Sequence, residues 1–332
     1  WRVRSSMNTL SEALGITCSA DIGLMSISYT CFDGESSFSH ALSLTTTGVN
    51  TSRLNRLEHF VSDFPAEGIH MSGEALHSQL DEIERIHGLY SPASLGLASA
   101  LACGAFTFLL GGGPLEMILA FAGAGIGNAI RCKLGKHHFT LFMCIAVSVS
   151  SACLVYAGFL KLAELLFHIS VQHEAGYICS MLFIIPGFPF ITSGIDLAKL
   201  DLRSGLERLA YAIIIVMVAT MFAWIMALLL QLKPMDFEDL DLGPVLHLIL
   251  RLIMSFFGVF GFSIMFNSPA PMAATAALIG AIANSLRLEL VDLTGMPAPA
   301  AAFAGALTAG LLASFIKENN GYPRISLTVP SI

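Results

Sequence analysis

The chain has 332 residues, of which 55% are hydrophobic and only 12% are charged, and its formal net charge is −7 at pH 7. A soluble globular domain carries about 25% charged residues, so this composition excludes an ordinary soluble protein. The acidic balance also argues against a nucleic-acid partner, which needs a basic surface. The hydrophobicity is uneven, because residues 1–90 are polar whereas residues 92–332 carry repeated long apolar stretches.

Residues 1–90 predict a small α/β domain. Strand-like runs lie at 17–21, 25–32 and 40–47, with the turn dipeptide Asp33-Gly34 between the second and third. Gly48 and Asn50 precede a first helix, and a second helix is expected at 73–87. Asp21, Ser28 or His40 could serve a hydrolase, but nothing in the sequence fixes their geometry. A gate, assembly or regulatory module is the more economical interpretation.

The remainder predicts eight membrane spans. A span needs about 20 apolar residues, because about 30 Å of hydrocarbon is crossed at about 1.5 Å per residue. The expected spans lie near 92–110, 114–133, 139–160, 177–194, 205–231, 245–266, 271–290 and 297–316. The chain opens at Trp1 without an initiator methionine or a signal region, which predicts a piece of a longer protein.

The placement of Lys and Arg predicts the orientation of these spans. If the N-terminal domain is cytoplasmic, the inside loops after it hold Arg131, Lys133, Lys136, Lys199, Arg203, Arg208, Lys317 and Arg324. The outside loops then hold only Lys161, Lys233 and Arg287. This asymmetry favours a cytoplasmic N-terminal domain.

The expected fourth span is interrupted by Pro186, Gly187 and Pro189. Prolines lack a backbone donor, and the carbonyls they free in hydrocarbon must find partners in protein or in a water-filled cavity. Broken helices of this kind hold the cargo in many transporters, although a simple packing kink is an equal alternative. Thr192 could bond the freed backbone, and Asp196 follows closely enough to line the same cavity.

An internal repeat appears when the chain is shifted by 156 positions. Asn128 then meets Asn284 and Arg131 meets Arg287, among matching apolar and small residues. Because an odd number of spans separates the copies, they would run in opposite directions through the membrane, as in many secondary transporters. Each Asn either forms a structural hydrogen bond between helices or binds the cargo. Each Arg either snorkels to the membrane surface or serves the site.

The repeat predicts three regions. They are a cytoplasmic α/β domain at 1–90, a first transmembrane repeat of five spans at 91–232, broken at 186–189, and a second repeat at 233–332. Only three spans of the second repeat are present. The counterpart of Pro186 would lie ten positions beyond Ile332, so we expect ten spans in the intact protein.

Three acidic residues are candidates for proton coupling, because ionisable side chains in or near spans are costly. Glu116 begins the second span and could instead cap the helix dipole. Asp196 and Asp201 follow the broken span, where a solvated charged loop is the plain alternative. The seven cysteines show no metal-ligand spacing, so we expect structural roles and no metal or cofactor.

At these motifs the sequence resembles the threonine/serine exporter family. The resemblance rests on Pro186-Gly187-Phe188-Pro189-Phe190-Ile191-Thr192, Asp196-Leu197, Asp201-Leu202-Arg203-Ser204-Gly205-Leu206 and, near the N-terminus, Gly48-Val49-Asn50 with Arg53-Leu54. The second half, with Gly261-Phe262 and Phe266-Asn267-Ser268-Pro269, looks like the smaller partner domain of that family. The form with both halves in one chain is typical of bacterial and fungal members. The motif positions carried over are Pro186, Gly187, Pro189, Asp196, Asp201, Ser204 and Gly205.

The resemblance implies a secondary exporter of threonine and serine, driven by protons and not an enzyme. A succinate-like dicarboxylate is an alternative cargo, and a passive channel is an alternative mechanism. We expect an integral protein of a plasma or vacuolar-type membrane that can form a homo-oligomer. Its partners are then the small-molecule cargo, protons and lipid.

Overall fold

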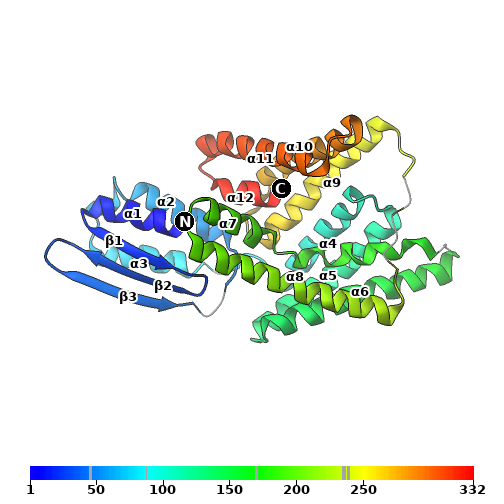
Figure 1. Ribbon diagram of the computed structural model, residues 1–332, viewed down its shortest axis with the longest axis horizontal. Helices are drawn as coiled ribbons and strands as arrows, with labels where there is room; N and C mark the ends of the chain where they lie inside the picture. Colours follow the sequence, from blue (N-terminus) through cyan, green and yellow to red (C-terminus); the bar gives the residue numbers. More distant parts are fainter. Residues whose placement is uncertain (45–46, 87, 169–170, 234–236, 238–239) are drawn as a thin grey trace. The chain divides into compact units, whose positions relative to one another are not determined.

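The computed structural model describes residues 1–332 except 45–46, 87, 169–170, 234–236 and 238–239, and it leaves out the side chains of residues 171, 172 and 319 (Figure 1). The chain divides into two compact units. The first comprises Trp1–Gly88 and Gly187–Ile213, and the second comprises Leu89–Pro186 and Ile214–Ile332. The N-terminal α/β region therefore belongs to the same unit as the segment that follows Pro186.

The α/β region contains an antiparallel sheet in the order β1-β2-β3, formed by Thr17–Ile22, Ser26–Phe32 and Ser37–Ser43. The turn at Asp33-Gly34 is confirmed, with Gly34 at φ 100° and Asp33 Oδ1 accepting hydrogen bonds from the N–H groups of Glu35 and Ser36. These bonds lower the pKa of Asp33, the bond from Ser36 most. Because the turn is this short, β3 begins three residues before the predicted position.

Helices flank the sheet in the first unit (Figure 1). They are α1 (Arg2–Leu14), α2 (Thr51–Asp63), the short η1 (Gly68–His70) and α3 (Gly73–Glu84). Asn50 caps α2 as predicted, since its Oδ1 accepts from Arg53 N–H at 3.0 Å. The predicted end of the second helix, residue 87, lies outside the described residues. Helix α1 was not predicted, and its clearest sequence signal is Gly15, which ends it in the left-handed conformation.

Seven helices of the described part are long and apolar enough to cross a membrane, or up to eight if the pair on either side of Ile185 and Pro186 counts as one bent span. They are α4 (Pro92–Leu109), α5 (Pro114–Lys136), α6 (Leu141–Phe167), α8 (Leu202–Leu230), α9 (Pro244–Met265), α10 (Ala270–Thr294) and α11 (Ala298–Asn320). Proline at the first position of α4, α5 and α9 suits its fixed φ and missing N–H. The chain is thus a helical polytopic membrane protein with a small N-terminal α/β region.

The fourth predicted span consists of three short pieces instead of one kinked α-helix. These are the 3₁₀ segments η2 (Val171–Tyr177) and η3 (Cys179–Ile184), followed by α7 (Gly187–Ala198). Ile185 is extended, at φ −60° and ψ 120°, as expected for the residue before a proline. Pro189 lies in the first turn of α7, where a missing N–H is tolerated. Pro186 therefore marks the interruption and Pro189 does not.

In the second unit, glycines of α5 let the backbone approach its neighbours closely. A Cβ on Gly123 would lie 2.9 Å from Ala152 O on α6 and 2.9 Å from Ser180 Cβ on η3. One on Gly127 would lie 2.9 Å from Ser148 O and 3.0 Å from the ring of Phe183. The pair has the four-residue spacing of close-packed membrane helices. It places η3 directly against α5.

Helices α4 and α9 pack against each other in the same unit. The rings of Phe106 and Phe262 lie 5.3 Å apart, and a Cβ on Gly258 would lie 2.6 Å from Phe106 Cε2. Gly261 faces Ala98 O, about two turns earlier on α4. Contacts that advance along α4 thus move back along α9, so the two helices are antiparallel.

The sheet register makes a testable prediction about two cysteines. Cys18 and Cys31 are directly opposite each other on β1 and β2, with their sulfur atoms 3.4 Å apart. Counted from the hydrogen bond between Gly23 N–H and Ser26 O, this is a non-hydrogen-bonded pair, where the Cα atoms approach to about 4.5 Å, within disulfide range. Mild oxidation should therefore join these two thiols, and peptide mapping would detect the cross-link.

Burial, with the hydrogen bond to Cys18, raises the pKa of Cys31. The Cys18→Ser variant is the matched control and should lose the cross-link. A cross-link from Cys31 to any other cysteine would contradict the register.

Candidate functional site

The second unit buries an ionisable pair at the start of α5. Glu116 lies in the first turn of that helix and is 4% exposed. Its Oε1 is 2.5 Å from His173 Nδ1 on η2, and its Oε2 has no hydrogen-bond partner among the described residues. Tyr156 OH donates to the carbonyl oxygen of His173 at 2.6 Å, which fixes the histidine backbone. Within the part of the chain that the structure describes, one carboxylate oxygen of Glu116 is therefore paired and the other is not.

Sequence reasoning found Glu116 but missed His173. The two residues are 57 positions apart, and no spacing rule brings them together. The helix-dipole interpretation of Glu116 also fits its position, but Glu116 does not cap the helix, since the N-cap is Gly113 and no side chain caps this end.

Asn128 and Arg131 lie on one face of α5, as predicted, and are bonded to each other. Arg131 Nε donates to Asn128 Oδ1 at 3.0 Å, and Asn128 Nδ2 donates to Leu95 O on α4 at 2.9 Å. The Arg131 guanidinium also lies 5.9 Å from the ring centroid of Phe183 on η3. These contacts join α4, α5 and η3, so the pair holds this bundle together.

Within the described part of the chain, the equivalent residues of α10, Asn284 and Arg287, show no such bonds. Asn284 is 2% exposed, and its Nδ2 has no partner among the described residues. The Nε of Arg287 is likewise buried and unpaired within the described part. The same sequence spacing therefore gives a closed pair on α5 and an open one on α10.

A third charged cluster joins α9 to α10. Arg251, 8% exposed, donates from Nη1 to Glu289 Oε1 at 2.7 Å and from Nη2 to Asp292 Oδ2. A buried guanidinium held by two carboxylates satisfies its charge within the protein. Arg251 thus bridges two helices.

The first unit contains the two other proposed coupling acids, and both are engaged. Asp196 Oδ1 lies 3.1 Å from the main-chain nitrogen of Trp1, and its Oδ2 lies 3.3 Å from Arg208 Nη1 without hydrogen-bond geometry. Asp201 accepts from the same nitrogen at 2.8 Å and from Arg4 Nη2 at 3.3 Å. Both carboxylates therefore face the positive end of the α1 dipole.

The motif that follows Asp201 joins α8 to the sheet and to α7. Ser204 Oγ donates to Ile22 O at 2.7 Å, at the end of β1. Arg203 pairs with Asp21, and Glu207 accepts from Leu24 N–H at 2.6 Å. A Cβ on Gly205 would lie 2.7 Å from Leu197 Cγ, and Ser193 Oγ donates to Gly205 O at 3.0 Å. In the first unit these residues hold α8 against the sheet and against α7.

The remaining predicted site residues lie at or beyond the break. Pro186 is buried, whereas Gly187 and Pro189 are half-buried. A Cβ on Gly187 would meet nothing within 4 Å, so no close approach requires a glycine there. Thr192 Oγ1 donates to Phe188 O at 2.8 Å, which ties its hydroxyl to the helix itself. Gly187, Pro189 and Thr192 belong to the first unit, whereas Asn128 and Asn284 belong to the second.

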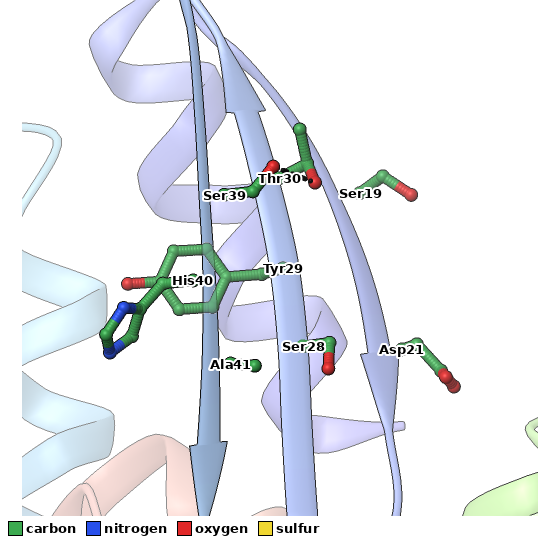
Figure 2. A pocket seen from close by; sticks show the side chains of 8 residues that line it. All are labelled: Ser19, Asp21, Ser28, Tyr29, Thr30, Ser39, His40 and Ala41. Atoms are coloured by element: carbon green, nitrogen blue, oxygen red, sulfur yellow. Dashed lines mark hydrogen bonds between the residues drawn. The ribbon is translucent and has the colours of Figure 1, made fainter.

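The sheet does not assemble the hydrolase considered from the sequence. A hollow on it is lined by Ser19, Asp21, Ser28, Tyr29, Thr30, Ser39, His40 and Ala41 (Figure 2). Asp21 and Ser28 are cross-strand partners, but the side chain of His40 points to the other side of the sheet, with that of Tyr29 (Figure 2). Among the described residues, no group of three or more His, Cys, Asp or Glu could hold a metal ion.

Buried charges inside a bundle of apolar helices, beside an interrupted span, define the class of protein as a membrane transporter. Residues 1–231 match the family described as "Putative threonine/serine exporter", and residues 251–332 match the family described as "Threonine/Serine exporter, ThrE". The chain belongs to the threonine/serine exporter family and carries both of its domains. No curated protein and no solved structure matches it. Membership implies an integral membrane amino-acid exporter whose substrate is threonine or serine, and not an enzyme.

Two motif glycines should respond differently to alanine. Gly205→Ala places a methyl group against Leu197, and relieving such a clash costs about 1–3 kcal/mol. Gly187→Ala meets nothing within 4 Å and should be neutral or slightly stabilising. Thermal unfolding of the purified protein in detergent would compare them. Equal midpoints for the two variants would contradict the close α7–α8 contact.

Proposed function

We propose that the protein is a secondary active exporter of threonine and serine, and that Glu116 and His173 couple the export to protons. The observation that carries this proposal is their buried contact, with one carboxylate oxygen left unpaired. An unpaired buried carboxylate is costly, whereas its protonated form needs less solvation. Proton uptake and release at this pair would therefore favour different conformations of η2 and α5.

A hollow of about 470 Å³ lies beside the segment that carries His173. It is lined in part by Lys161, Glu164, Glu174 and Lys233, and Glu174 is the chain neighbour of His173. Glu174 Oε2 accepts from the N–H of Lys233 at 2.6 Å, which keeps the segment carrying His173 beside the hollow.

We further infer that the membrane region consists of two inverted repeats. The helix bounds support this, because α5 and α10 both begin at matched positions in the 156-residue offset. The antiparallel contact of α4 with α9 supports it too, since the matched residues Phe106 and Phe262 touch each other there, as a pseudo-twofold axis requires. The chain continues through α12 (Arg324–Thr328) to η4 (Val329–Ser331), and by the same offset η4 falls on residues 173–175 of η2.

The N-terminal α/β region is proposed to be a cytoplasmic regulatory module, in a plasma or vacuolar-type membrane. Asp196, Asp201, Ser204 and Gly205 would act as positioning residues that fix the α7–α8 corner to this module, which their bonds to α1 and β1 support. Their part in proton coupling is therefore less favoured than that of Glu116. We also propose that the protein can assemble as a homo-oligomer.

Transport by the reconstituted protein tests the coupling. Labelled threonine efflux from loaded vesicles should rise when a pH gradient is imposed. In the Glu116→Gln and His173→Gln variants, efflux should fall to the level seen without a gradient, while threonine–threonine exchange continues.

The matched control is Glu164→Gln on α6, whose carboxylate pairs with Lys161 at 3.8 Å at the rim of the hollow. It should keep the response to the gradient. Equal wild-type efflux with and without the gradient would remove the coupling, and flux that does not saturate would indicate a channel. Efflux of succinate in place of threonine would indicate the alternative cargo.

A further inference from the structure

We propose that Asn284 and Arg287 on α10, together with Ser255 on α9, form a subsite for the carboxylate group of the cargo. The proposal rests on the proposed export of threonine and serine, and it assigns the carboxylate end of the cargo to these three residues. The three side chains offer an amide, a guanidinium and a hydroxyl, which are all hydrogen-bond donors.

Asn284 and Ser255 are buried residues, whereas Arg287 is partly buried with its Nε enclosed. Asn284 is 2% exposed and Ser255 is fully buried. Within the described part of the chain, Asn284 Nδ2, Arg287 Nε and Ser255 Oγ all lack a hydrogen-bond partner. Buried polar groups in proteins are nearly always bonded, so several unpaired donors in one place indicate an acceptor that binds there.

The packing of α9 on α10 brings the donors together. A Cβ on Gly280 would lie 2.5 Å from Val259 Cγ2, and at the other end Arg251 reaches Glu289 and Asp292. Ser255 is one turn from both Val259 and Arg251 on α9. It therefore faces the turn of α10 that lies between these contacts, which carries Asn284.

Asn284 and Arg287 are three positions apart and so share one face of the helix. The first half of the chain shows that this spacing allows contact, because Arg131 Nε and Asn128 Oδ1 are 3.0 Å apart at the equivalent positions.

The first half also serves as an internal control. There the equivalent donors are all used within the protein. Asn128 Nδ2 donates to Leu95 O at 2.9 Å, and Ser99 Oγ donates to Gly96 O at 2.8 Å and to Ala124 O at 3.1 Å. A purely structural role thus produces closed bonds from the same residues. The open donors of the second half require a different explanation.

The charges around Arg287 favour a carboxylate as the acceptor, because the nearby acids already have a partner. Glu289 and Asp292 are the acids nearest to Arg287 along α10, and both are bound by Arg251. No ion pair of Arg287 is found among the described residues, so its positive charge is available to a ligand. Guanidinium binds the two oxygens of a carboxylate in a planar fork, and amide and hydroxyl donors can complete the set.

Burial makes such a subsite selective. In a site shielded from water, a charge-assisted hydrogen bond is stronger than at the surface. An analogue without the carboxylate would leave the guanidinium unpaired. The subsite should therefore reject an analogue of threonine without the carboxylate. Threoninol, in which the carboxylate is replaced by a hydroxymethyl group, is that analogue.

The test compares binding of threonine and threoninol to the purified protein by calorimetry, together with efflux from vesicles. Wild type should prefer threonine by about tenfold or more, the effect of about one charge-assisted bond. Arg287→Gln should remove this preference by weakening threonine binding alone. Arg287→Lys should restore part of it, and Asn284→Leu should reduce it.

Arg131→Gln is the matched control, because it breaks the closed pair of the first half. It should lower the unfolding temperature and leave the preference for threonine intact. An Arg287→Gln protein that elutes as a single species and still prefers threonine would overturn the subsite.

Failure of the subsite and failure of the proposed function give different results. If wild type moves threonine and Arg287→Gln does so with unchanged affinity, only the subsite is wrong. If wild type binds succinate but not threonine, and Arg287→Gln loses succinate, the subsite stands and the proposed cargo is wrong. If neither acid binds in a manner that depends on Arg287, the subsite is overturned.

Discussion

The interrupted segment between α6 and α8 depends on one constraint, which is that hydrocarbon cannot satisfy a backbone polar group. Two 3₁₀ segments, whose backbone groups lie outside the α-helical pattern, precede Ile185. Their enclosure by other helices solves this, and Gly123 and Gly127 make it possible by removing the Cβ atoms that would separate α5 from α6 and η3. The same enclosure brings His173 against Glu116, so the packing that permits the break also creates the buried ionisable pair.

The acidic and hydroxyl residues around Asp201 follow a different logic. In the first unit, each bonds to a group at an element end, namely the start of α1 or the β1–β2 turn. Backbone groups at helix ends and turns lack partners within their own elements, and side chains from α8 supply them. Charge in this unit therefore fixes the corner of two helices to a small sheet. That role explains why Asp196 and Asp201 are buried, because the cations beside them compensate their charge.

Much of this architecture could be predicted from the sequence, because apolar length and turn residues are local signals. The spans, the Asp33-Gly34 turn and the Asn50 cap all follow from neighbours in the chain. The contact of Glu116 with His173 could not be predicted, since it joins distant segments through packing. The predicted break at 186–189 includes Pro186, where the helix is interrupted, but Pro189 lies within α7, and the 3₁₀ geometry before Pro186 depends on how η3 fits against α5. Likewise, the Asn and Arg repeats were visible, but their bonding was not.

The difference between the two Asn–Arg pairs cannot arise from the helices that carry them, because the spacing is the same. It arises from what each pair faces. On α5 the partners are Leu95 O and the Phe183 ring, the latter supplied by the interrupted segment. Leaving a buried donor unpaired costs about 1–3 kcal/mol, so the open pair on α10 is a standing loss of stability within the described structure. A protein tolerates such a loss where binding offsets it. In a family that exports amino acids, the carboxylate of the cargo is the acceptor that we propose for this pair.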